Sequence, residues 1–270
     1  MTPAHSAIKP TQWIAFRELL WNLTWRDIRV RYRQTMLGIA WAVLSPLSMM
    51  VIFTFVFGGT QVSTEGIPYA LYAYCGLAPW AFFANSLNGA ANSIVAHRSL
   101  VTKVYFPREV FPLSCVAGAL VDFCISLMLL FGLMAYFARF GGHAPRIGSA
   151  LLMLPVVIVV QILLTVGLGL LVSMANLFYR DVRSILALAL QLGLFVSAVV
   201  VPLPSRGSTA YALLSWNPMV SLMQSYRDCL LHGRWPEFGG LTYAAAVGVV
   251  VVGVSAWLFR RASPRFAECV

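Results

Sequence analysis

Long stretches without charged residues dominate the chain, and short segments between them hold almost all of its charges. A helix needs about 20 apolar residues to cross the roughly 30 Å of hydrocarbon in a bilayer. Six stretches reach that length, and only one of them contains a charged residue, Asp122. The pattern therefore predicts an all-α integral membrane protein with six transmembrane helices, at 34–64, 66–96, 110–138, 147–179, 184–205 and 238–259.

The segment between the second and third predicted spans, residues 97–108, is short and basic. Arg98, Lys103 and Arg108 lie among apolar residues, which is typical of an amphipathic segment at a membrane surface. Phe106 precedes a proline, and this disfavours the helical region for its backbone, so a short helix should end there. We expect a compact elbow on the cytosolic side.

The residues before the first span, 10–33, are amphipathic at helical spacing. Apolar side chains lie along one flank, and Arg26, Arg29 and Arg33 lie on another. Trp21 and Trp25 are of the type favoured at headgroup depth. This pattern predicts a helix in the cytosolic interface. A plain basic flank to the first span is the alternative.

The region before the last span, residues 205–235, is weakly charged but too polar to face lipid. Residues 209–216 are long enough for a two-turn helix. Asn217 can cap a second helix that begins at Pro218 and ends near Leu231. Two short helices dipping into the outer leaflet fit this pattern, because backbone at that depth must be shielded by protein. A surface loop resting on the membrane is the alternative.

Asp122 is the only ionisable group that this topology places deep in hydrocarbon. A carboxylate inside a membrane is by default a candidate for function. A protonated or hydrogen-bonded aspartate that joins two helices is the other reading. The sequence leaves both open.

Composition and charge agree with a membrane protein. Of the 270 residues, 60% are apolar and 10% are charged, with a net charge of +10. Too little polar surface is available to cover a water-soluble domain of this size. With six spans and cytosolic termini, 14 of the 19 lysines and arginines lie inside, as the positive-inside rule requires. The positive net charge therefore reflects the membrane topology and contact with anionic lipid. Nucleic-acid binding is not expected.

The sequence lacks the motifs of an energy-converting enzyme. A phosphate-binding loop needs a lysine after glycine, whereas Lys9 and Lys103, the only lysines, both follow other residues. The four histidines and five cysteines are scattered, so neither metal sites nor disulfides are expected. We expect no enzymatic activity, and any transport must draw its free energy from a partner.

Several segments together resemble a known family. The arginine-rich lead into Leu-Gly-Ile-Ala-Trp and the Lys-Val-Tyr-Phe-Pro-Arg elbow are the most specific of them. They resemble the permease (transmembrane) subunit of type-2 ABC exporters for cell-surface polysaccharide, the group that exports O-antigen, capsule or teichoic acid. The likeness covers nearly the whole chain, and the segments that carry it are 25–46, 75–82, 100–114, 179–182 and 216–218.

The resemblance implies a single transmembrane domain, residues 1–270, in the bacterial inner membrane. It implies a homodimer paired with two copies of a nucleotide-binding ATPase subunit, which alone binds ATP and Mg, so that this chain has no cofactor. Residues 10–33 are then the interface helix, 97–108 the coupling elbow and 205–235 the re-entrant gate region. The expected cargo is a lipid-linked polysaccharide.

The resemblance also suggests residue roles. The outer gate would include Trp216, Asn217 and Pro218. Aromatic rings suit a sugar path because they stack without fixed hydrogen bonds; the candidates are Trp41, Phe53, Phe57, Tyr69 and Trp80. The residues expected to couple to the ATPase are Arg98, Lys103, Tyr105, Phe106, Arg108, Arg180 and Asp181.

Three other functions are compatible with parts of this pattern. A type-2 ABC permease for teichoic acid, drugs or lipids would share the topology. A membrane-embedded transferase would need paired polar catalytic groups near one face, and only Asp122 is available. A passive channel or scaffold would work without an ATPase, so co-purification of a nucleotide-binding subunit separates it from an ATP-driven exporter.

Overall fold

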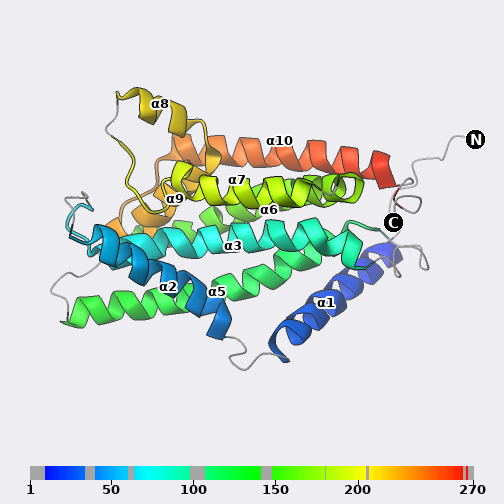
Figure 1. Ribbon diagram of the computed structural model, residues 1–270, viewed down its shortest axis with the longest axis horizontal. Coiled ribbons are helices and arrows are strands. Elements are labelled where there is room, and N and C mark those ends of the chain that lie inside the picture. Colours follow the sequence, from blue (N-terminus) through cyan, green and yellow to red (C-terminus); the bar gives the residue numbers. More distant parts are fainter. Residues whose placement is uncertain are drawn as a thin grey trace, which may run out of the picture.

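The computed structural model describes residues 10–33, 40–59, 64–97, 107–140, 148–179, 181–204, 207–263 and 266. Within these residues the protein is all-helical, without β-strands, as expected. The long helices run side by side in an elongated bundle (Figure 1). The start of α1 and the end of α10 lie at one end of the bundle, and α8 and α9 lie at the other.

Among the described residues, four helical segments are long and apolar enough to cross a membrane. They are α2 (Ala40–Phe57), α5 (Val110–Phe140), the η1–α6 segment (Ser149–Phe178) and α10 (Phe238–Ala262). Two more helices run beside them, α3 (Tyr69–Ala96) and α7 (Val182–Val196). A predicted span coincides with each of these six elements, but only four of the six are long and apolar enough to count as candidate membrane spans.

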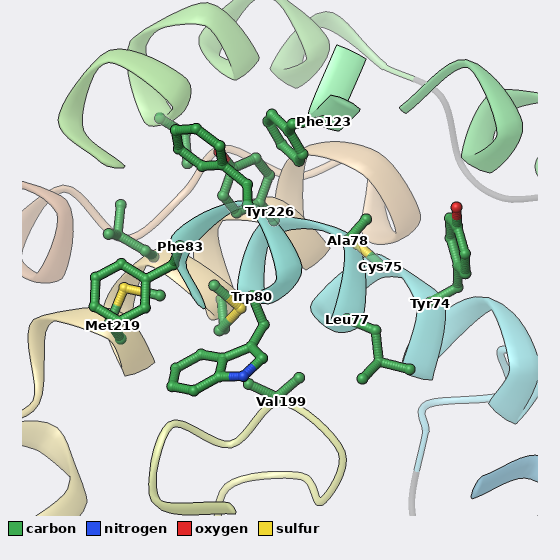
Figure 2. Packing of buried hydrophobic residues seen from close by; sticks show 14 of the residues in the cluster. Tyr74, Cys75, Leu77, Ala78, Trp80, Phe83, Phe123, Val199, Met219 and Tyr226 are labelled. Atoms are coloured by element: carbon green, nitrogen blue, oxygen red, sulfur yellow. The ribbon is translucent and has the colours of Figure 1, made fainter. Parts of the chain in front are cut away.

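Helix α3 is the centre of the bundle. It packs against α2, α5, α6, α7 and α9, and most of its 28 residues are buried. In Figure 2, Trp80 points toward Val199, while Phe123 and Tyr226 lie together on the opposite side of α3. Because protein covers α3 on most sides, the hydroxyls of Ser86 and Ser93 are buried and need not face lipid, whereas Asn85 and Asn88 are exposed.

Helices α6 and α10 approach each other closely because both carry glycine at the contact. A Cβ on Gly167 would lie 2.8 Å from the backbone nitrogen of Val252, and one on Gly248 would lie 3.4 Å from the nitrogen of Leu164. Small residues at such contacts let backbones approach and increase van der Waals attraction, which is a main source of helix association in lipid.

Helix α1 has the bounds expected for the interface helix, Pro10–Arg33. It packs against α5 and lies obliquely to the other long helices (Figure 1). Trp21 and Trp25 stack with ring centroids 6.3 Å apart and are exposed at 68% and 47%. These exposed rings are consistent with an interfacial helix, because tryptophan is favoured at headgroup depth.

The two short helices expected before the last span are both present. Helix α8 covers Thr209–Ser215, and α9 covers Pro218–Arg227 and continues as a π-helical turn, η2 (Asp228–His232). Gly233 follows with φ +63°, in the left-handed region that glycine tolerates, and this ends the helix. The chain then enters α10, which packs against α9.

Candidate functional site

Four buried residues after α7, Ser197 to Val200, form a turn on which other elements converge. They are at most 4% exposed, and Ala198 has φ +52°, an uncommon backbone conformation for alanine. The Tyr69 hydroxyl donates to the Val200 carbonyl at 3.0 Å. The Arg227 Nη2 donates to the Val199 carbonyl at 2.7 Å. Side chains from α3 and α9 thus satisfy carbonyl groups that a continued helix would have bonded.

A glycine permits this convergence. A Cβ on Gly76 would lie 2.5 Å from the Val199 carbonyl oxygen and 3.0 Å from Nη2 of Arg227. Any larger residue at this position would collide with backbone, which cannot move aside as a flexible side chain can. Gly76 therefore sets how closely the turn approaches α3.

The expected gate residues begin α9 and join it to its neighbours. Asn217 caps the helix, since its Oδ1 accepts from the Met219 backbone nitrogen at 3.0 Å, and Pro218 is the first helical residue. The Asn217 Nδ2 also donates to the Ser197 hydroxyl at 3.0 Å. Trp216 is 76% exposed, and its carbonyl accepts from the Tyr243 hydroxyl of α10 at 2.8 Å.

Three of the five candidate path aromatics form one row of rings. The centroids of Phe53 and Phe57 are 6.2 Å apart, those of Phe57 and Tyr69 are 6.1 Å apart, and Tyr72 follows Tyr69 at 6.3 Å. The row ends where the Arg227 guanidinium lies 3.9 Å from the Tyr72 ring centroid.

The other two candidates lie apart from this row. Trp41 is 51% exposed on α2. Trp80 is buried against α7, where a Cβ on Gly193 would come within 2.8 Å of its Cη2 atom. Trp80 therefore packs inside the single chain and does not face an open path there.

A buried polar network that the sequence analysis missed joins α3, α6 and α9. Gln161, which is fully buried, donates from Nε2 to the Pro79 carbonyl at 2.7 Å. Its Oε1 accepts from the Tyr226 hydroxyl at 2.6 Å. The available signal was a single glutamine inside the apolar stretch 147–179, where a polar side chain needs protein partners.

A pocket of about 590 Å³ opens beside α9, between the start of α10 and the segment before α3. Three of its charged groups form ion pairs: the Arg234 Nε lies 2.7 Å from Asp228 Oδ1, and its Nη1 lies 3.4 Å from Glu65 Oε2. His232 Nδ1 is 3.3 Å from the same Glu65 oxygen. Burial raises the pKa of Asp228 and lowers that of His232, which favours the neutral imidazole at pH 7.

At the opposite end of the bundle, the last elbow residues contact the C-terminal part of the chain. Arg108 donates to the Ser263 carbonyl and lies over the Phe266 ring, 5.7 Å from its centroid. Arg260 Nε lies 3.3 Å from Glu109 Oε1. The elbow is thereby tied to the end of α10.

Most of the predicted coupling residues lie outside the described residues, namely Arg98, Lys103, Tyr105, Phe106 and Arg180. Asp181 is described. It is exposed immediately before α7, and its carbonyl accepts from the Ile185 nitrogen at 3.0 Å. The expected role of all these residues in coupling to the ATPase stays a prediction.

Asp122 is buried, and its carboxylate is bonded to helix α1. Arg31 Nη1 donates to Oδ2 at 2.5 Å, and the Tyr32 hydroxyl donates to Oδ1. This geometry favours the reading in which the aspartate joins two helices. The sequence analysis did not identify its partners, because it placed the arginines of α1 in the interface.

Comparison with known proteins places the chain in a family. A family model for ABC-2 type transporters matches residues 18–231. The chain belongs to the ABC-2 type transporter family. It is 34% identical over 259 residues to the O-antigen export system permease protein RfbA of Myxococcus xanthus, with 94% of this chain and 96% of the relative covered.

Other relatives of this ABC-2 transporter carry related names. An O-antigen export system permease protein RfbA of Klebsiella pneumoniae is 30% identical over 254 residues, covering 93% of this chain and 94% of the relative. The polysialic acid transport protein KpsM of Escherichia coli is 26% identical over 237 residues, covering 87% and 90%. The resemblance that the sequence indicated, to permease subunits of type-2 ABC exporters for polysaccharide, is thereby confirmed.

Proposed function

We propose that this ABC-2 transporter chain is the transmembrane subunit of an ATP-driven exporter that moves a lipid-linked, O-antigen-like polysaccharide across the bacterial inner membrane. One observation carries the proposal: relatives named as O-antigen export permeases match more than nine-tenths of the chain. The more distant polysialic acid transport relative makes a capsule-type polysaccharide the second candidate.

In this proposal the chain has six spans and cytosolic termini. Helices α3 and α7 are the two spans in addition to the four candidate spans. Helix α3 has 28 residues, about 42 Å of helix, which exceeds the hydrocarbon thickness. Helix α7 has only 15 residues, and the turn at 197–200 would complete its crossing. The α8–α9 region would then re-enter the outer leaflet, where α3 and α10 pack against α9 and would shield its polar backbone.

Two copies of the chain would enclose the path. Only 11% of the span window in α2 is buried, and Phe55 is 92% exposed. Helix α7 likewise exposes Ile185 at 64% and Leu192 at 57%. A homodimer with these faces toward its axis would line a pore with apolar and aromatic groups, which suit sugar rings.

The free energy would come from two copies of a separate nucleotide-binding subunit, which binds ATP and Mg. ATP closure of those subunits would press on the elbow at 97–108 and on Tyr179–Arg183. The contacts of Arg108 and Glu109 with the end of α10 support transmission along this helix to α9, against which it packs. Opening of the α8–α9 gate would follow.

The test is to purify the chain with its nucleotide-binding subunit, in lipid nanodiscs, and to measure ATP hydrolysis with lipid-linked glycans. We expect an O-antigen-type glycan to stimulate hydrolysis several-fold, and an ATPase subunit lacking its phosphate-loop lysine to abolish both hydrolysis and transport. Uphill transport by the chain alone, or failure of any nucleotide-binding subunit to co-purify, would contradict the proposal.

A further inference from the structure

The pocket beside α9 is built from segments that are distant in sequence. Its lining comes from the residues before α3, from α3 itself, from the segment after α7, and from the stretch that runs from α8 to the start of α10. A volume of about 590 Å³ falls in the range of small-molecule sites, roughly 300–1,000 Å³. A pocket of this size can hold a sugar unit.

Arg227 is the least satisfied polar side chain of this pocket. It is 1% exposed, and within the part of the chain that the structure describes only its Nη2 donates a hydrogen bond, to the Val199 carbonyl. Its Nε and Nη1 are buried without an acceptor among the described residues. The neighbouring carboxylate, Asp228, is bonded to Arg234 instead. A buried charge with unused donors is costly, so oxygen acceptors entering the pocket would stabilise it.

The wall also supplies neutral hydrogen-bonding groups and aromatic rings. Ser221 and Gln224 line it from α9, and both are partly exposed. Tyr211 from α8 and the half-exposed Trp235 add rings. Hydroxyl and amide groups match the hydroxyls of a sugar, and an aromatic ring packs against its apolar face.

The charges of the wall favour an uncharged occupant. Among the described residues, three carboxyl groups line the pocket, Glu65, Asp228 and Glu237, against two guanidinium groups. An anionic ligand would therefore meet carboxylates close by, whereas a neutral polyol can donate to those carboxylates and accept from Arg227.

We propose that this pocket binds a neutral sugar unit, with Arg227 donating to its hydroxyl oxygens and Gln224 and Trp235 holding its rim. The site lies within one protomer, and it deepens the proposed function by giving the cargo glycan a docking point beside α9. The inference rests on that function only for the source of the sugar, because binding itself needs no ATPase.

The experiment is a titration of the purified chain in lipid nanodiscs, free of sugar-based detergents. The probes are methyl galactoside, methyl glucoside, galacturonic acid and galactose 6-phosphate. Binding is followed by isothermal titration and by tryptophan fluorescence. At least one neutral glycoside should bind saturably and at least tenfold more tightly than both acidic sugars. Absence of saturable neutral-sugar binding, or tighter binding of an acidic sugar, would overturn the proposal.

Variants assign the binding to this pocket. Arg227→Gln should weaken it at least tenfold, whereas Arg139→Gln, the same change at an exposed arginine outside the lining, should not. Should Arg227→Gln fail to fold, Gln224→Ala on the partly exposed wall carries the test, with exposed Gln191→Ala on α7 as its control. Equal affinity in pocket and control variants would place the sugar elsewhere and overturn the assignment.

The two proposals fail separately. If glycan stimulates hydrolysis by the complex but no neutral sugar binds the chain, the pocket assignment is wrong and the exporter function stands. If a neutral sugar binds in the pocket but no glycan stimulates hydrolysis in the complex, the exporter function is wrong and the pocket stands.

Discussion

Arg31 donates a 2.5 Å hydrogen bond to Asp122, and this bond joins the end of α1 to the middle of α5. The Tyr32 hydroxyl binds the second carboxylate oxygen. A Cβ on Gly118, one turn before Asp122, would touch Nη2 of Arg31 and the side chain of Ile28 at ordinary contact distances. Helix α1 is thus held to the bundle by a buried carboxylate as well as by apolar packing.

Asp122→Asn should lower the free energy of unfolding by about 1–3 kcal/mol, because a buried hydrogen-bonded charge pair loses its acceptor charge. Chemical denaturation in mixed micelles measures the change. The control is Asp27→Asn, whose carboxylate pairs with the exposed Arg26 and should change stability by less than about 0.5 kcal/mol. A double-mutant cycle with Arg31→Gln should give a coupling of about 0.5–3 kcal/mol, and a coupling of zero would refute the pairing.

Gly76→Ala should destabilise the protein by about 1–3 kcal/mol or more, because its Cβ would collide with the Val199 carbonyl and displace the 197–200 turn. Gly132→Ala in α5 is the matched control, since no atom lies within 4 Å of its added Cβ. That change should be neutral or stabilising by up to about 1 kcal/mol. Thermal unfolding compares the two, and equal melting temperatures would contradict the close approach.

Gly193→Ala should lower the melting temperature by several degrees, because the added methyl group meets Cη2 of Trp80 at 2.8 Å. Trp80→Phe removes that part of the ring, so the double variant should be more stable than expected from the two single changes added together. Strict additivity of the two changes would show that these residues do not touch.

Gln161→Leu should cost about 1–3 kcal/mol, because the Tyr226 hydroxyl is then buried without its partner. Combining it with Tyr226→Phe should recover part of the loss, since both partners become apolar. Denaturant titration of the single and double variants measures this. A double variant less stable than Gln161→Leu alone would argue against the bond.

Phe266→Ala should reduce transport per ATP hydrolysed several-fold in the complex with its ATPase, because it loosens the contact of Arg108 with the end of α10. Arg261→Ala, which removes only a contact with the Trp257 ring on the same helix, should leave this ratio unchanged. The ratio is read from parallel export and phosphate-release assays. An unchanged ratio with Phe266→Ala would show that coupling bypasses this contact.

The sequence predicted local features of the fold well. The bounds of α1, the short helices α8 and α9, and the cap at Asn217 follow from residue types that act on their immediate neighbours. The partners of Asp122, Gln161 and Arg227 could not be predicted, because each lies on a different element, 91, 82 and 28 residues away along the chain. Such pairings depend on how the helices rotate against each other, and hydropathy does not encode that rotation.

Helix α7 has 15 residues, about 22 Å of helix, and the turn that follows it at 197–200 is held by side chains of other elements. Two of those bonds, from Arg227 and Asn217, come from α9 and its cap. Any separation of α9 from this turn must therefore break both bonds and expose the Val199 carbonyl and the Ser197 hydroxyl, which water or sugar hydroxyls could then occupy. In the proposed exporter, opening at this end would require both hydrogen bonds to break, so the loss of either bond alone would leave α9 attached to the turn.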